Sequence, residues 1–190
     1  MTKVVADISM SLDGYVTGPD PDLRHGLGRG GEPLHTWVME SGDEVDAQVL
    51  REATEASGAV VMGRRLFDIV DGPGGWNDEM GYGAGLVGKP AFFVVTHSAP
   101  QSVRLALDFT FVTDGLPSAI DRARAAAGDR DVVVMGGGNV IGQCIAGGLV
   151  DELRLHLAPI ILGGGTPLFE GTVRRQLTQT SVGCRRRRPI

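Results

Sequence analysis

The chain has 190 residues, a formal net charge of −5 and 42% hydrophobic residues, which suits one domain with a sizeable core and excludes a disordered chain. The acidic balance argues against binding nucleic acid over the whole surface. Cys144 and Cys184 have no disulfide or zinc spacing, and neither a secretory signal nor a membrane-length apolar run is visible. We expect a single cytoplasmic domain over residues 1–190, with residues 183–190 poorly ordered and with no nucleic-acid or membrane partner.

The first half of the chain alternates short apolar runs with helical patterns. Val45, Val49, Leu50 and Ala53 recur at helical spacing after Ser41, which is a suitable N-cap. In chain order, the predicted elements are a strand at 4–12, helices at 34–39 and 43–56, a strand at 59–62, a helix at 66–70, and strands at 91–96 and 109–113.

The second half continues the alternation and then changes character. We predict a helix at 116–127, a strand at 131–135, a helix at 140–147, a strand at 151–158 extended by 159–162, and a last strand at 176–182. In the strand at 151–158, leucines alternate with Arg154 and His156, which predicts one buried apolar face. The pattern predicts a three-layer α/β fold with a mixed, mostly parallel central sheet. The closing strands lack intervening helices, so we expect them to be antiparallel.

The most informative motif is a buried apolar run that ends in Gly136, Gly137 and Gly138 at a helix start. Glycine permits positive φ and close approach of a ligand, and the free N–H groups of the helix favour an anion. We therefore expect a phosphate-bearing cofactor here. The usual G-x-G-x-x-G pattern is absent because Ile141 stands at its last position, so a tight turn without a ligand is the alternative.

Two other predicted strand ends carry groups suited to phosphate. Arg64 and Arg65 follow Gly63 at a helix start, where guanidinium groups and backbone N–H groups bind anions; a solvated arginine pair is the alternative. Thr96 and His97 follow the strand at 91–96, and ligands of open α/β sheets gather beyond the carboxyl ends of strands. A plain surface histidine is the alternative there.

Other catalytic classes have little support. The sequence contains neither G-x-S-x-G nor H-E-x-x-H, and its histidines have no metal-binding spacing. We expect Trp37 and Trp76 in the core rather than in a ligand pocket, Cys144 buried in a helix, and His156 structural or solvated.

Taken in order, the motifs resemble a known family. They lie at residues 9–16, 62–67, 94–97, 135–141, 149–153 and 158–169. This arrangement resembles the dihydrofolate-reductase-like superfamily, specifically the reductase domain at the carboxyl end of bacterial riboflavin-biosynthesis deaminase-reductases. The resemblance covers residues 4–169.

The resemblance implies that NADPH lies across the strand ends, that the segment 11–16 flanks the nicotinamide and the substrate, and that the chain forms a homodimer through the region after Asp151. Thr96 and His97 would lie near the adenosine 2′-phosphate. The remaining cofactor-binding residues implied by the resemblance are Gly63, Arg64, Arg65, Gly136, Gly137, Gly138, Asn139, Val140 and Ile141.

Two departures from the family pattern matter. Riboflavin-pathway reductases carry a Glu directly before the glycine pair, where it helps to hold the substrate, and here that residue is Met135, a weak acceptor. The family also ends in an aromatic, alternating strand, whereas this chain ends in an arginine-rich segment at 185–188. That segment is either a solvated terminus or a local nucleic-acid contact.

These observations lead to two hypotheses. The first is an NADPH-dependent reductase that transfers hydride to a small planar heterocycle, pteridine-like or pyrimidine-like. Asp13 is the acidic residue nearest the expected nicotinamide and is the candidate proton donor, although ordered water is an equal candidate and an Asp-Gly turn is often purely structural. The second is a non-catalytic sensor that binds NADPH or a flavin nucleotide, which the absence of an acid at Met135 favours.

Overall fold

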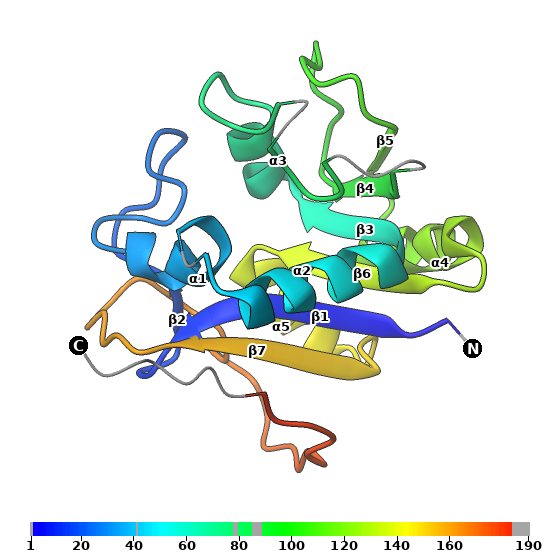
Figure 1. The fold of residues 1–190 in the computed structure, drawn as a ribbon. Helices are drawn as coiled ribbons and strands as arrows, with labels where there is room; N and C mark the ends of the chain where they lie inside the picture. The colour runs from blue at the N-terminus through cyan, green and yellow to red at the C-terminus, as the bar shows by residue number, and fades with distance from the viewer. Residues whose placement is uncertain (1, 41, 78–79, 85–88, 184–190) are drawn as a thin grey trace.

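A six-stranded sheet forms the centre of the molecule (Figure 1). The fold, taken from a computed structural model, is described for residues 2–40, 42–77, 80–84 and 89–183. The strand order is β5-β4-β3-β6-β1-β7, and every neighbouring pair is parallel. The strands are β1 (Val4–Ser11), β3 (Ser57–Gly63), β4 (Ala91–Val95), β5 (Phe109–Val112), β6 (Asp131–Gly136) and β7 (Glu152–Ala158).

Helices cover both faces of this sheet and complete the three-layer arrangement predicted from the sequence. In Figure 1, α2 crosses in front of β1 and β6, and α5 lies behind them. The helices are η1 (Glu32–His35), α1 (Thr36–Met39), α2 (Glu44–Ala56), α3 (Arg64–Val70), α4 (Leu116–Ala127) and α5 (Gly138–Ala146). No helix in the described part of the chain is long and apolar enough to cross a membrane.

The core lies on both faces of the central strands. One cluster joins β1, β3 and β6 to α4 and α5 and includes Ile120, Ile141 and Cys144, while a second joins β3 and β4 to Phe67 of α3. Strands that are buried on both faces read as continuous apolar runs, which is why β3 and β6 were recognisable in the sequence. Cys144 is fully buried, as expected, and burial raises its pKa to about 12.

The front helix α2 differs from the sequence prediction in its packing. None of its residues is buried, and Val45 and Val49 are 51% and 37% exposed. Its N-cap is Asp43, whose side chain accepts a hydrogen bond from the Val45 N–H group. Ser41, the predicted cap, lies outside the described residues.

The closing segment corrects two sequence predictions. β7 is parallel to β1, not antiparallel, because α5 acts as the crossover that returns the chain in the same direction. Antiparallel pairing occurs instead in a small separate sheet of β2 (Tyr15–Thr17) and β8 (Thr166–Pro167). The predicted extension at 159–162 and the predicted strand at 176–182 are wrong, since neither segment forms a strand.

The apolar face of β7 is also less buried than its alternation predicts. Leu153 packs against the core, but Leu155 is 36% exposed and Leu157 is 60% exposed. β7 is the edge strand of the sheet, so no further strand shields it on its outer side. By contrast, Arg154 and His156 on the opposite face are partly buried and hydrogen-bonded.

Candidate functional site

The parallel sheet brings the predicted motifs to one edge. Strands that run in the same direction end on the same side, so the segments after β1, β3, β4 and β6 meet there. The strand register aligns Met62 with Gly136 and Gly63 with Val95. The three motifs recognised separately in the sequence therefore line a single edge of the sheet.

The backbone around the glycine turn is tightly packed at two positions. A Cβ atom on Gly63 would lie 2.8 Å from Val140 Cγ2, and one on Gly138 would lie 2.7 Å from Val16 Cγ2. Gly136 has φ +125°, a conformation that side chains disfavour, and the Gly136–Gly137 peptide bond is cis. Glycine is therefore required at these three positions by the fold itself.

Gly137 differs from its neighbours because the space beside it is open. A Cβ atom there would have no heavy atom within 4 Å, and its φ of −68° is accessible to any residue. Gly137 is also the N-cap of α5 and contributes no side chain to the cap. The first N–H groups of the helix lack intrahelical partners and favour an anion. These features fit a cofactor that carries phosphate groups.

The residues that follow Gly138 at the start of α5 contribute mainly to packing and to hydrogen bonds within the helix. The N–H groups of Val140 and Ile141 donate to the Gly137 carbonyl, and the Ile141 side chain is fully buried in the core. Asn139 is exposed, and its Oδ1 atom accepts a hydrogen bond of 2.7 Å from Gln143. Gly137 and Asn139 are thus the exposed residues of the predicted motif, whereas Gly138 and Ile141 are buried.

Arg64 and Thr96 come together beside this turn. The Arg64 guanidinium donates to the Ser98 carbonyl at 2.8 Å, and the Thr96 hydroxyl donates to the same carbonyl at 2.8 Å. Arg64 also forms an ion pair with Asp68, with Nε and Oδ1 2.7 Å apart. The loop after β4 is therefore tied to the start of α3, which supports the prediction that these residues form one site.

Arg65 and His97 are placed differently. The Arg65 guanidinium points away from Arg64 and donates to the carbonyl of Pro21. His97 is exposed and has no hydrogen-bond partner among residues that the structure describes. The two arginines of the motif therefore serve different loops, and His97 remains available at the surface.

Asp13 holds two loops together. Its carboxylate accepts hydrogen bonds from the Ser11 hydroxyl at 2.7 Å and from the N–H groups of Leu162 and Gly163 at 3.1 and 2.7 Å. The Ser11 bond and the two N–H groups lower the pKa of Asp13 to about 2. The carboxyl group is therefore ionised near neutral pH and has no proton to give, which favours the structural role that the Asp-Gly turn left open.

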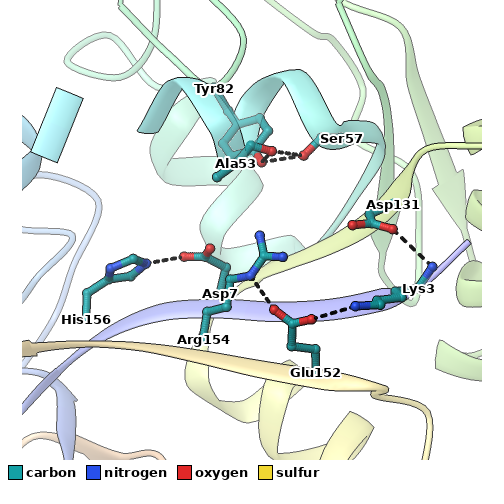
Figure 2. Close-up of polar contacts among 9 residues, drawn as sticks. All are labelled: Lys3, Asp7, Ala53, Ser57, Tyr82, Asp131, Glu152, Arg154 and His156. Atoms are coloured by element: carbon teal, nitrogen blue, oxygen red, sulfur yellow. Dashed lines mark hydrogen bonds and ion pairs between the residues drawn. The ribbon is translucent and has the colours of Figure 1, made fainter. Parts of the chain in front are cut away.

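An Asp–His pair that the sequence analysis missed lies on the front face of the sheet. His156 Nε2 and Asp7 Oδ1 are 2.8 Å apart (Figure 2). Trp37 stacks on His156 with ring centroids 4.1 Å apart, and its Nε1 atom donates to Ser9. The available signal was the polar residue at every second position of β1, where Asp7, Ser9 and Ser11 interrupt an otherwise apolar strand.

Further polar contacts surround this pair. Figure 2 shows Arg154 bonded to Glu152, with Nε and Oε1 2.7 Å apart, and Tyr82 beside Ser57, with their hydroxyl oxygens 2.6 Å apart. Burial raises the pKa of Tyr82 to about 12, and the Arg154 hydrogen bond lowers that of Glu152. Trp76 packs edge-on against Phe92 in the core, as predicted.

Comparisons with known proteins give a match to one family model and to solved structures of similar fold. The profile of the family described as RibD C-terminal domain matches residues 2–187. The chain is 22% identical over 173 residues to the uncharacterized protein YyaP of Bacillus subtilis (strain 168), covering 88% of this chain and 80% of YyaP. A putative riboflavin biosynthesis protein from Shewanella sp. PV-4 has a TM-score of 0.63 at 24% identity, covering 92% of this chain and 86% of that protein. A pyrimidine reductase-like protein from Corynebacterium diphtheriae has a TM-score of 0.54 at 20% identity, covering 88% and 79%.

Replacing Asp13 with Asn tests its structural role. Because folding lowers the Asp13 pKa from 3.8 to about 2, the ionised carboxylate stabilises the fold above about pH 4, and this contribution is lost as the pH falls towards about 2. The melting temperature of Asp13→Asn should therefore be lower than that of the wild type at pH 7. The difference between the two melting temperatures should disappear between pH 4 and pH 2. Exposed Glu170→Gln is the control. A difference in melting temperature that does not change with pH would contradict a stabilising role of the ionised Asp13 carboxylate.

Proposed function

The chain belongs to the RibD C-terminal domain family, and we propose that it is an NADPH-dependent reductase acting on a small planar heterocycle, pteridine-like or pyrimidine-like. The observation that carries the proposal is the open space at Gly137, beside the uncapped start of α5. That space lies at the edge where four parallel strands end. When bound, NADPH supplies a hydride for a C=N or C=O bond, and the protein supplies orientation and exclusion of water.

The glycine turn would hold the charged bridge of the cofactor. Gly137 leaves room for the pyrophosphate, and the N–H groups of Gly138 and Asn139 precede the first hydrogen bonds of the helix. Gly63, at the end of the neighbouring strand β3, lies against Val140 of α5 and places no side chain beside the turn. Recognition of the pyrophosphate would thus depend on backbone groups rather than on a charged side chain.

The end of β4 would hold the adenosine 2′-phosphate. Thr96 offers a hydroxyl, His97 an exposed imidazole, and Arg64 a guanidinium fixed between Asp68 and the Ser98 carbonyl. Charge-assisted hydrogen bonds from such groups favour a dianionic phosphate over the hydroxyl of NADH. We therefore propose NADPH rather than NADH as the preferred cofactor, with Arg64 contributing after rearrangement around Asp68.

The substrate would lie next to the β1–β2 turn, over residues 11–16. A neighbour of similar fold is described as pyrimidine reductase-like, which favours a pyrimidine-like ring. Because Asp13 is ionised and engaged with the 162–163 backbone, it would shape this pocket instead of donating a proton. Protonation then requires ordered water or another side chain.

A non-catalytic sensor that binds NADPH or a flavin nucleotide is the second candidate function. The observation that favours it is Met135, which packs against the apolar cluster of β3, β4 and α3 where riboflavin-pathway reductases carry a substrate-holding Glu. A sensor would bind the cofactor without oxidising it. Turnover therefore separates the two functions.

We also propose a homodimer through the apolar side of β7. Leu157 is 60% exposed and Ile161 is 73% exposed, and both follow Asp151 in the region that the family resemblance implies for assembly. Apolar side chains on an edge strand favour association with another copy. A second copy would bury these side chains.

Gly137→Val tests the cofactor site. Valine fits the open space and the backbone angle, so the melting temperature should stay near that of the wild type, while its side chain blocks the pyrophosphate. We expect NADPH binding, measured by calorimetry, to weaken at least about 100-fold, the loss of about 3 kcal/mol. NADPH oxidation with a panel of pterins and pyrimidinones should disappear with it.

Gly74→Val is the matched control for Gly137→Val, because a Cβ atom on Gly74 also meets no heavy atom within 4 Å and Gly74 lies outside the turn, so NADPH affinity should be unchanged. Unchanged NADPH affinity in Gly137→Val would remove the glycine turn as the site. Binding by the wild type without oxidation of any panel member would favour the sensor.

Acidic residues at Thr96 and His97 test the 2′-phosphate contact. In the double variant Thr96→Asp/His97→Asp, repulsion of the phosphate should lower the ratio of NADPH to NADH affinity by at least about tenfold, since hydrogen bonds to charged groups contribute about 1.5–3 kcal/mol. Gln101→Glu adds a negative charge elsewhere in the same loop and serves as control. An unaltered ratio in the double variant would contradict the contact.

Leu157→Lys tests the dimer. A charged side chain at this exposed position leaves the core intact, so the variant should fold but elute as a monomer under conditions where the wild type is dimeric, measured by light scattering. Leu23→Lys, at a 65% exposed position far earlier in the chain, is the control. A monomeric wild type, or a dimer that survives Leu157→Lys, would count against this interface.

A further inference from the structure

The Asp7–His156 pair lies beside the glycine turn, although neither residue belongs to a motif. β1 and β6 are parallel, with Val5 beside Val133 and Ala6 beside Val134. This pairing ends at Ala6 and Val134; Asp7 comes directly after Ala6, and Gly136 comes two residues after Val134. Asp7 and the glycine turn therefore lie towards the same end of two neighbouring strands.

The pair is held in a defined orientation and remains accessible. His156 is aligned with Ser9 in the register of β7 and β1, and its ring lies between the Asp7 carboxylate and the indole of Trp37, with an interplanar angle of 23° to the indole. The Trp37 ring is fixed in turn by its 2.8 Å hydrogen bond to Ser9. The side chains of His156 and Asp7 are 19% and 20% exposed, so a ligand on the front face can reach them.

We propose that His156 donates the proton that accompanies hydride transfer and that Asp7 is its positioning residue. This inference rests on the reductase function proposed above. As hydride adds to the carbon of the C=N or C=O bond, the electron pair of that bond moves to the nitrogen or oxygen. That atom takes a proton from the His156 imidazolium, which becomes neutral imidazole and is reprotonated by solvent. Overall, one substrate, one NADPH and one proton give one reduced product and one NADP⁺.

The other acidic groups near the front face are poorly suited to this role. Hydrogen bonds from Ser11 and from two backbone N–H groups lower the Asp13 pKa to about 2, so it holds no proton near neutral pH. Burial raises the Tyr82 pKa to about 12, and its hydroxyl is engaged with Ser57. Imidazole is the side chain that gives and recovers a proton near neutral pH, and a neighbouring carboxylate stabilises its charged form.

Other polar and charged groups lie near the Asp7–His156 pair. On β7, Glu152 forms ion pairs with both Arg154 and Lys3. His35 of η1 interacts electrostatically with His156, and Tyr82, from the loop after α3, interacts with Asp7. Trp37 of α1 is uncharged. Asp7 is thus the one anion bonded directly to the His156 ring in the described part of the chain.

His156→Gln is the primary test. Glutamine keeps an N–H donor for Asp7 but has no titratable proton, so a structural role would be preserved and proton donation would be lost. We expect kcat with the best pterin or pyrimidinone to fall at least about 100-fold, the usual contribution of a general acid. NADPH affinity and melting temperature should remain near wild-type values. The control is His25→Gln, which removes the exposed His25–Asp22 pair of 3.3 Å.

Asp7→Asn tests the positioning role. A carboxylate holds the His156 ring, 2.8 Å away, more strongly than a neutral amide does, so kcat should fall while NADPH affinity and melting temperature stay near wild-type values. An unchanged kcat overturns the positioning role of Asp7, and this variant decides the proposal if His156→Gln fails to fold.

Trp37 provides a readout that does not need turnover. In a Trp76→Phe background, its fluorescence should report the stacking of the His156 ring, whose centroid lies 4.1 Å from that of the indole. Asp7→Asn should change this signal because it weakens the contact that orients the His156 ring.

The failures of the two proposals are distinguishable. If the wild type oxidises NADPH but His156→Gln keeps kcat within about threefold, a loss far below that expected for a general acid, proton donation by His156 is overturned and the reductase function stands. Trp37 fluorescence that is unaffected by Asp7→Asn overturns the positioning role of Asp7. A wild type that oxidises NADPH with no panel member overturns the reductase function and the proton donor together.

Discussion

Close packing of valine side chains against glycine residues, at the junction of β3, β6 and the start of α5, is the constraint on which the rest of the structure depends. A Cβ atom at Gly63 or at Gly138 would lie less than 3 Å from a valine methyl group. Removing side chains from these positions lets two strand ends, the β1–β2 segment and a helix start meet at one edge. The same packing leaves open space at Gly137, at the start of α5.

Asp7 in β1 and Asp13 just after β1 have different hydrogen-bond partners, and these partners give the two carboxylates different chemical properties. Asp13 accepts three hydrogen bonds, which keep it ionised and tie the 162–163 loop to the end of β1. Asp7 bonds to a single imidazole on the neighbouring strand and retains partial access to solvent. The Asp-Gly motif predicted a chemical role for Asp13. The structure makes Asp7 the better candidate, because its hydrogen-bond partner, His156, is itself a titratable group.

The family and the element order were predictable because they depend on local patterns. The apolar run at 132–135 and the helix at 116–127 match β6 and α4, and the family match over residues 2–187 confirms the resemblance read from the ordered motifs. The strand predicted at 176–182 was wrong: the segment forms no strand, and Leu177 and Val182 are 68% and 74% exposed. The cofactor-binding assignments remain predictions, although Arg64 and Thr96 do come together.

The sequence by itself determined the α/β class, the glycines required at the turn and the family, because hydrophobic periodicity and glycine placement act over a few neighbouring residues. Only the tertiary structure decided that β7 is parallel, that Leu157 is exposed, and that His156 meets Asp7 across 149 positions of chain. Strand order sets those contacts, and strand order follows from packing the whole sheet between its helices. No local pattern in the chain encodes it.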